Sequence, residues 1–312
     1  MQDQSRLRAP QLVDLTNFTS TLIRRRSWLI AFIILDIVVI ITILNSPVLI
    51  DAWNYIWPGR NDTASITVIS FIVAVVIGLV VALARISKNW IIYNIATFYV
   101  ELFRGLPLLV IILLFNFVLT QAFVDFVSGP EVRGQALIDN PDANTPNIPF
   151  LDDLLQRLFG VDPELIPTTK LRSRDISELF RIMLAFALTY GAFMSEVFRA
   201  GIESIGKGQS EAARSLGMTY VQTMRYIILP QAVRNVLPAL ANNFILLLKD
   251  TSLASAVAVR EISYLARQYS SNFFRYPEGL LIISFLYANL TIILSFISQA
   301  IENLTRGDRK ED

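Results

Sequence analysis

The sequence predicts an all-α protein that crosses a membrane several times. Of its 312 residues, 54% are hydrophobic and only 17% are charged, and the mean hydropathy is +0.51. A water-soluble domain usually has about a quarter of its residues charged. The apolar residues also gather in runs of about 20, the length at which a helix spans the hydrocarbon core of a bilayer.

Six such runs are expected to form membrane helices: residues 28–45, 66–84, 106–127, 178–198, 232–258 and 279–301. A shorter, half-apolar piece from Ile91 leads into the third run. The first run follows three arginines and is not followed by a small-residue cleavage site, so we expect a retained helix rather than a signal peptide. Asp36 interrupts this first helix, where a structural partner or a subunit contact is expected for it.

Basic residues set the expected orientation, because Lys and Arg collect on the cytoplasmic side of membrane proteins. Five arginines precede the first run, so the N-terminus is expected inside, and six crossings return the C-terminus there. The segments 46–65, 128–177 and 260–277 are then expected outside. The segment 128–177 has eight acidic and five basic residues. It is interpreted as an external lobe or a partly disordered insert.

Several functions are made improbable by what the sequence lacks. It has no cysteine and no histidine, which removes thiol chemistry, the commonest general base and the commonest metal ligand. A net charge of +1 gives no sign of nucleic-acid binding. The letters GKGQS at 206–210 lack the spacing of an ATP-binding phosphate loop. No catalytic residue, metal site or bound cofactor is therefore predicted for this chain.

Residues 202–230, named here the EAA segment, are polar between two apolar runs. Ser210 is expected to cap a first short helix, and Gly217 falls where a left-handed helix end would lie. Thr219 and Gln222 fit a capping box for a second helix. By pattern alone, a surface helix without a partner is an equally good interpretation.

The EAA segment resembles the signature of ATP-binding-cassette (ABC) importer permeases. In EAARSLGMTYVQTMRYIILP, residues 211–230, every fixed position of that signature is matched: Glu211, Ala212, Ala213, Gly217, Ile227, Leu229 and Pro230. The flanking stretches AFMSEVFRAGIESIGKGQSEAARSLGM (192–218), ILPQAVRNVLPALANNFILLLKDTSL (228–253) and FRGLPLLV (103–110) resemble polar amino-acid permeases of the histidine, glutamine and arginine type. The resemblance covers about 66–302, apart from the insert.

This resemblance implies a type I importer transmembrane domain, MetI-like, with about six helices: a five-helix core and one N-terminal helix. Residues 1–65 would form the cytoplasmic N-terminus, the extra helix and a short external loop. Residues 66–302 would form the permease domain, with the external insert at 128–177 and the EAA segment, and 303–312 a cytoplasmic tail. The extra helix and the insert depart from the family pattern.

The resemblance also implies a function. The chain would be a non-catalytic permease subunit that moves polar amino acids across the plasma (inner) membrane of a prokaryote. Its partners would be an ABC ATPase dimer that binds ATP and Mg, a second permease subunit, identical or paralogous, and an external amino-acid-binding protein. The EAA segment would be the coupling helix held by the ATPase, with the residues Glu211, Ala212, Ala213, Arg214, Leu216 and Gly217.

Ionisable groups inside membrane helices are costly and usually face a partner or a water-filled path. An amino acid needs both donors and acceptors along its path, and the fifth run supplies them: Asn242, Asn243, Lys249, Asp250, Thr251 and Ser252. Alternatively, Lys249 and Asp250 pair with each other and stabilise a dimer. Two further pairs at helical spacing are expected to form gates or structural ion pairs: Glu101 with Arg104, and Glu196 with Arg199.

Three other classes of protein fit the sequence less well than an importer permease. A secondary, ion-coupled transporter usually has inverted repeats, and none is visible. An intramembrane enzyme would need a nucleophile and a base in one constellation, which the sequence does not suggest. A structural membrane subunit would leave the ordered EAA segment unexplained.

Overall fold

The computed structural model describes residues 27–127 and 176–307, and every regular element in these ranges is helical. The chain divides into two units, Met1–Asn54 and Tyr55–Asp312. The N-terminal arginines and all but the last two residues of the predicted insert lie outside the described residues. The domain boundaries predicted at 65 and 302 remain predictions.

The first unit contains α2 (Ser27–Asn45) and most of α3 (Pro47–Ile56). The predicted first helix is thus present, with its apolar side chains largely exposed. The segment 46–65, however, was expected to be a loop and is helical, so this prediction is wrong. Pro47 is the first residue of α3, and a proline in the first turn does not interrupt a helix.

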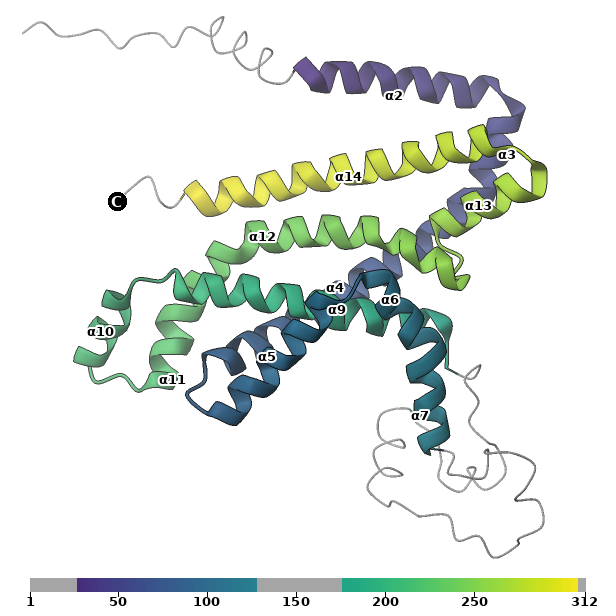
Figure 1. Cartoon of the computed structure of the whole chain (residues 1–312). Coiled ribbons are helices and arrows are strands. Elements are labelled where there is room, and N and C mark those ends of the chain that lie inside the picture. Colours follow the sequence, from purple (N-terminus) through teal and green to yellow (C-terminus); the bar gives the residue numbers. More distant parts are fainter. Residues whose placement is uncertain (1–26, 128–175, 308–312) are drawn as a thin grey trace, which may run out of the picture. The chain divides into compact units, whose positions relative to one another are not determined.

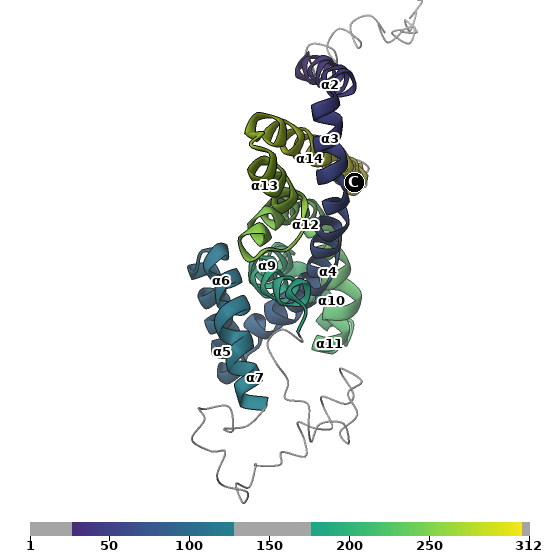
Figure 2. The same ribbon diagram turned by 90° about the vertical axis from the view of Figure 1, so that its right-hand side faces the viewer.

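The second unit is a bundle of helices (Figures 1 and 2), and short turns join them except between α7 and α9. In chain order its elements are η1 (Trp57–Gly59), α4 (Arg60–Ile86), α5 (Trp90–Gly105), α6 (Leu108–Leu113), the π-helix η2 (Leu114–Leu119), α7 (Thr120–Val127), α9 (Glu178–Glu203), α10 (Lys207–Ser215), α11 (Tyr220–Thr223), the π-helix η7 (Met224–Ile228), α12 (Leu229–Asp250), η8 (Thr251–Val257), α13 (Ile262–Phe273) and α14 (Tyr276–Gly307).

Within residues 27–127 and 176–307, four helical stretches are long and apolar enough to cross a membrane: Trp28–Asn45, Pro47–Ile86, Glu178–Glu203 and Tyr276–Ala300. A fifth is added if α5 and the helix that follows it count as one span, although the two meet at 104°. The bend has a local cause, since Pro107 disfavours a helical conformation at Leu106, which is extended (φ −103°, ψ 139°).

The predicted fifth run, 232–258, differs most from the structure. The helix α12 begins three residues earlier, at Leu229, and ends at Asp250. A 3₁₀ turn follows and closes with Ala258 in the left-handed region, at φ 63°. Within the described residues α12 is not among the helices apolar enough to be counted as a membrane span, because polar residues punctuate it throughout.

The core of the second unit lies where α4 and α9 pack along each other, with α5 and α12 beside them. Close approach depends on Gly78, because a Cβ at this position would lie 2.7 Å from the Cβ of Met194. Two polar side chains of this region form hydrogen bonds across helices. The Ser70 hydroxyl donates to the Met183 carbonyl at 3.1 Å, and the Tyr99 hydroxyl donates to the Leu188 carbonyl at 2.5 Å.

Candidate functional site

The EAA segment forms a helical hairpin at one end of the second unit, where α10 and α11 lie beyond the ends of α9 and α12 (Figure 1). Its corner is at Gly217, which has a φ of 76°. The Gly217 amide donates to the Arg214 carbonyl at 2.9 Å, and the Met218 amide donates to the Ala213 carbonyl at 3.1 Å. These two bonds form a Schellman motif, so the predicted left-handed helix end is confirmed.

The second predicted cap is also present. The Gln222 amide donates to the Thr219 hydroxyl, and the Thr219 amide donates to the Gln222 side chain, which completes a capping box. The prediction for Ser210 is wrong, because Gly206 stands at the N-cap of α10. Ser210 lies inside α10 and donates to the Lys207 carbonyl instead.

Five of the six predicted coupling residues are exposed: Glu211, Ala212, Arg214, Leu216 and Gly217. Leu216 is 82% exposed, an unusual position for a leucine in a polar segment. Ala213 is the buried residue of α10. The small side chains therefore serve two surfaces, since Ala212 faces outward and Ala213 lets α10 pack closely on its own chain.

The hairpin is fixed to the long helices that carry it. A Cβ on Gly201 of α9 would come 2.1 Å from Cγ1 of Val236 in α12, so the Val236 side chain packs directly against the backbone of α9. Nearby, the Asn235 side-chain amide donates to the Ser204 hydroxyl at 3.1 Å. The buried Ile202, Ile228 and Ala232 form a small apolar cluster between α9, η7 and α12. A displacement of the hairpin must therefore move α9 and α12 with it.

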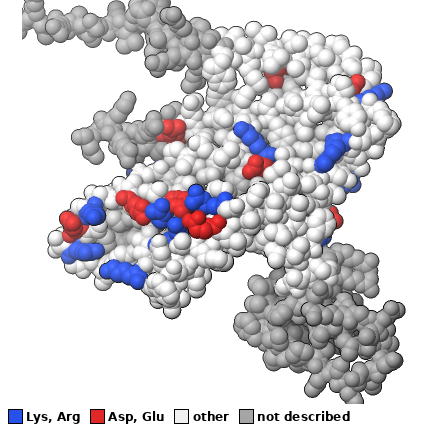
Figure 3. Space-filling model, in the orientation of Figure 1, with Lys and Arg blue, Asp and Glu red and all other residues white. Residues whose placement is uncertain are grey.

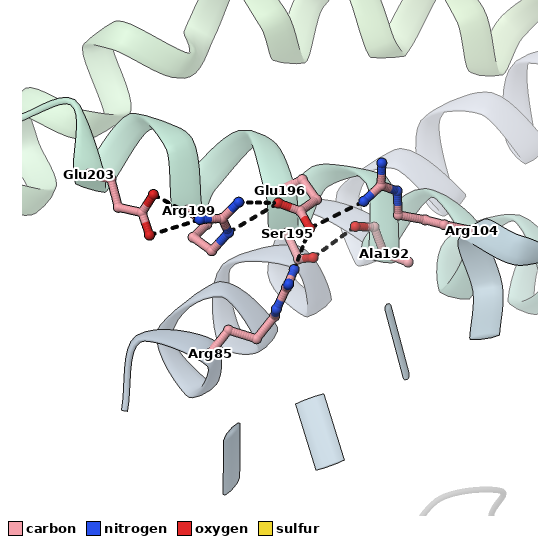
Figure 4. A network of polar contacts seen from close by, with 7 residues as sticks. All are labelled: Arg85, Arg104, Ala192, Ser195, Glu196, Arg199 and Glu203. Atoms are coloured by element: carbon pink, nitrogen blue, oxygen red, sulfur yellow. Dashed lines mark hydrogen bonds and ion pairs between the residues drawn. The ribbon is translucent and has the colours of Figure 1, made fainter. Parts of the chain in front are cut away.

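Just before the hairpin, charged side chains from three helices converge on Glu196 (Figure 4). Its carboxylate lies 2.5 Å from Arg85 of α4, 3.2 Å from Arg104 of α5 and 2.8 Å from Arg199 of α9. Arg199 also contacts Glu203 at 2.8 Å. We call these five residues the Glu196 cluster. Figure 3 shows that charged side chains gather at this end of the molecule, whereas most of the remaining surface in view is uncharged.

The Glu196 cluster confirms one predicted pair and corrects the other. Glu196 and Arg199 are paired, as the spacing of three residues predicts. Arg104 pairs with Glu196 of α9 rather than with Glu101, which is exposed on α5. Arg85 is the residue that sequence reasoning missed, since it lies 111 positions from Glu196 in the chain.

The candidate path residues of α12 and η8 point in different directions. Asn242 is exposed, whereas the Asn243 amide donates to the Ala239 carbonyl of its own helix. Thr251 is fully buried and donates to the Leu248 carbonyl. The carboxylate of Asp250 accepts a hydrogen bond of 2.7 Å from the Tyr190 hydroxyl of α9.

Lys249 does not pair with Asp250, so the alternative of a simple ion pair is not supported. The two side chains face different helices, because neighbouring residues of an α-helix are about 100° apart around its axis. Lys249 and Ser252 line a cavity of about 580 Å³ against α14, together with Ser263, Tyr287, Thr291 and other residues. The path residues therefore form two separate places, one at Asp250 and one at Lys249.

A buried carboxylate that the sequence did not single out lies beside this cavity. Glu261 is fully buried at the N-cap of α13. Its oxygens accept hydrogen bonds from the amides of Ser263 and Tyr264 at 2.8 and 2.7 Å, and from the Tyr287 hydroxyl at 3.2 Å. Burial raises the pKa of the Glu261 carboxyl from 4.5 to about 7, against the opposing effect of these hydrogen bonds.

A second polar group outside the predicted set lies near the other end of α9. The Arg181 guanidinium donates to the Asn116 carbonyl, in the π-helix η2, at 3.0 Å. The sequence carries no signal for this contact, because a π-helical turn has no composition of its own. Among the described residues, no group of three or more acidic side chains is arranged to hold a metal ion.

Apolar helices that end in an exposed, doubly capped EAA hairpin define a membrane-embedded transport permease. The chain belongs to the family described as binding-protein-dependent transport system inner membrane component, whose model matches residues 74–307. It is a multi-pass membrane protein and the permease subunit of an ABC importer. Nothing in the comparisons supports a secondary transporter or a structural subunit.

Named relatives cover most of this chain. The arginine transport system permease protein ArtQ of Bacillus subtilis is 29% identical over 254 residues, which are 81% of this chain and 94% of that protein. The L-cystine transport system permease protein TcyB of the same species is 32% identical over 254 residues, 80% of this chain and 86% of that protein.

Solved structures agree on the fold. A crystal structure of an amino acid ABC transporter with histidines matches with a TM-score of 0.60 and 29% identity, covering 81% of this chain and 95% of that one. An inward-facing MetNI methionine ABC transporter matches with a TM-score of 0.56 over 80% of this chain and 96% of that one. At 16% identity the latter supports the fold alone.

Proposed function

We propose that this chain translocates polar amino acids and that a separate ATPase, which binds ATP and Mg, drives the transport. The substrate class is supported by the relatives, whose names specify arginine, L-cystine and glutamine. The observation that carries the coupling is the EAA hairpin. It exposes Glu211, Ala212 and Leu216 at the surface, while Gly201 and Val236 fix it to α9 and α12.

In this proposal the ATPase holds the EAA hairpin in a groove, with Glu211 and Ala212 at the contact and Gly217 at its corner. When the ATPase subunits close, the hairpin moves and takes α9 and α12 with it. The Glu196 cluster passes that movement to α4 and α5. Both termini lie in the cytoplasm, two permease subunits form the path, and a binding protein delivers the substrate from outside.

The Asp250 site supplies a reason for selecting a zwitterionic or cationic substrate. Its carboxylate is half-buried, and Tyr190 is its hydrogen-bond donor. A carboxylate in a membrane protein without a cationic partner is costly, unless a passing cation or water balances it. We infer that the substrate ammonium passes Asp250.

Charge reversal at the hairpin tests the coupling. The complex of this chain with its ATPase is placed in nanodiscs, and ATP hydrolysis is measured with binding protein loaded with different amino acids. Glu211→Lys is expected to abolish the stimulation by loaded binding protein, because it places a cation where the ATPase accepts a carboxylate. Asp51→Lys, a reversal at an exposed position of α3, serves as the matched control and is expected to keep the stimulation.

The results separate coupling from substrate. If Glu211→Lys and Asp51→Lys behave alike in folded complexes, the EAA hairpin is not the coupling contact. If wild-type hydrolysis is stimulated by another class of ligand but by no amino acid, the substrate class is wrong while the coupling stands. For the path, Asp250→Asn is expected to reduce uptake of cationic amino acids at least about tenfold, as the loss of a buried charged partner would.

A further inference from the structure

The end of the second unit opposite the EAA hairpin carries a basic and aromatic surface. The chain leaves the hairpin along α12, which is 22 residues and so about 33 Å long, and reaches α13 beyond its far end. We define the α13 surface by six residues that belong to α13 or flank it: Arg260, Arg267, Phe273, Phe274, Arg275 and Tyr276. All are exposed except Arg275, which is half-buried.

The charge of this surface is positive. Arg260 and Arg267 are exposed, and Arg60, on the neighbouring α4, lies over the Trp57 ring at 4.4 Å. The element η1, which carries Trp57, packs against α13. The acidic residues of this region are less exposed than Arg260 and Arg267. Glu261 is fully buried, and Asp62 and Glu278 are half-buried. Figure 3 shows basic side chains at this end of the molecule.

Three arginines in this position run against the usual distribution of charge. Residues 260–276 contain three arginines and a single acidic residue, the buried Glu261. In the proposed orientation the segment lies outside the membrane, where Lys and Arg are normally depleted from short loops. Arg267 has a structural role, because it donates to the Ser255 carbonyl at 2.8 Å. For the exposed Arg260, which topology disfavours, a binding role offers a physical reason.

One aromatic residue, Phe274, is placed unfavourably for the fold itself, whereas Phe273 packs on the rings of Tyr55 and Tyr269. Phe274 is 85% exposed and adopts the left-handed conformation, with a φ of 55°, at the C-cap of α13. A non-glycine residue in this region is strained, and Asn or Gly would adopt it more readily. Phe273 and Tyr276 beside it are about half exposed. Exposed aromatic side chains next to arginine are the composition typical of protein-binding hot spots.

The surface is held rigidly on the membrane helices. Glu261 caps α13 and accepts from Tyr287 of α14, while the Ile262 amide donates to the Thr63 hydroxyl of α4 at 3.2 Å. Gly59 packs so closely that a Cβ there would lie 2.7 Å from backbone atoms of Glu261 and Ile262. A displacement of α13 would therefore be transmitted directly to α4 and α14.

We propose that the α13 surface is the docking site for the external binding protein, which presents an acidic face and an apolar recess for Phe274. This inference rests on the proposed function, and the family description itself names dependence on a binding protein. Charge complementarity selects the occupant. Two copies of this basic surface would repel each other, whereas an acidic face of a protein partner would be attracted to it.

The test uses the complete complex, with its own ATPase and binding protein, in nanodiscs of phosphatidylcholine alone. The quantity measured is the binding-protein concentration that gives half-maximal stimulation of ATP hydrolysis. The variant is Arg260→Glu with Phe274→Asn, since asparagine keeps the left-handed conformation. The control is Lys88→Glu, the same charge reversal at an exposed residue before α5. Thermal unfolding confirms that each variant is folded.

The double variant is expected to raise the half-maximal concentration at least about tenfold, with unchanged basal hydrolysis, because peripheral charges act mainly on association. Lys88→Glu is expected to leave it unchanged. A double variant within about twofold of wild type overturns the docking site. So does an effect that appears only when phosphatidylglycerol is added, since lipid would then be the occupant. Absence of any stimulation in wild type would overturn the proposed function itself.

Discussion

The Arg85 guanidinium lies 2.5 Å from the Glu196 carboxylate and so joins α4 to α9 just before α9 enters the EAA hairpin. Arg104 and Arg199 contact the same carboxylate. Three arginines thus depend on one acidic residue, and Glu203 balances only Arg199. The arrangement fixes three helices to one another at the point where movement of the hairpin would enter the membrane domain.

Glu196→Gln is expected to destabilise the protein by about 2 kcal/mol, because it leaves the largely buried Arg85, as well as the more exposed Arg199 and Arg104, without their shared carboxylate. The measurement is the free energy of unfolding of the purified complex in detergent. Stimulated ATP hydrolysis is expected to fall relative to basal hydrolysis, since α4 and α5 no longer follow α9.

Glu203→Gln is the matched control for this prediction. Glu203 is the more exposed acid, with 56% of its side chain accessible against 22% for Glu196. Its removal is expected to change stability by less than about 0.5 kcal/mol. Equal effects of the two substitutions would show that Glu196 is not the centre of the cluster.

Gly217→Ala is expected to cost about 1 kcal/mol, because Gly217 has a φ of 76° and an L-residue pays a steric penalty in that region. Gly208→Ala, inside α10, is the control. A Cβ there would meet nothing within 4 Å, and no positive φ is involved. That change is expected to be neutral or slightly stabilising in thermal unfolding. A neutral Gly217→Ala would contradict the left-handed corner.

Gly201→Ala is expected to separate α9 from α12 and to destabilise the protein by about 1–3 kcal/mol, because its Cβ would overlap Cγ1 of Val236. Val236→Ala removes the overlapping atom, so the double variant is expected to recover most of the loss. Gly105→Ala, where a Cβ has open space, is the control for unfolding measurements. Additive effects of Gly201→Ala and Val236→Ala would refute the close contact.

Stability is expected to depend on pH through Glu261. The pKa of its carboxyl is raised by burial from 4.5 to about 7. Between these values the unfolded chain releases the proton while the folded protein keeps it, so the folded state binds more protons and stability falls as pH rises. Below about pH 4.5 and above about pH 7 this contribution becomes constant.

Thermal unfolding of the wild type and of Glu261→Gln across pH 4–8 measures this contribution. The slope between about pH 4.5 and 7 is expected to be smaller in Glu261→Gln, which has no proton to lose. Glu278→Gln, at a half-buried acidic residue of α14, is the control and should keep the wild-type slope. An identical slope in Glu261→Gln would refute the assignment of this titration to Glu261.

The sequence predicted correctly those features that depend on residues within one or two helical turns of one another. Four of the six predicted runs lie within or closely match helices long and apolar enough to span a membrane. The left-handed conformation of Gly217 and the capping box of Thr219 and Gln222 were predicted correctly. The prediction that Ser210 caps the helix failed because α10 begins at Lys207. Its N-cap position is Gly206, one turn earlier than the pattern suggested.

The charged residues were harder to assign, because their partners lie far apart in the sequence. The spacing of three residues favoured Glu101 with Arg104 as much as Glu196 with Arg199, yet only the second pair forms. Lys249 and Asp250 are neighbours in the chain and still face different helices. A helix turns by about 100° per residue, so two side chains that are neighbours in the sequence point toward different neighbouring helices.

The sequence by itself determined the class of protein, the helical corner at Gly217 and the position of the EAA segment, because hydrophobicity, caps and signature residues act locally. Only the tertiary structure decided that Arg85 reaches Glu196, that Tyr190 meets Asp250, and that Glu261 is buried under α13. These contacts join residues of different helices. They are set by how the helices pack, and no local pattern in the chain encodes that packing.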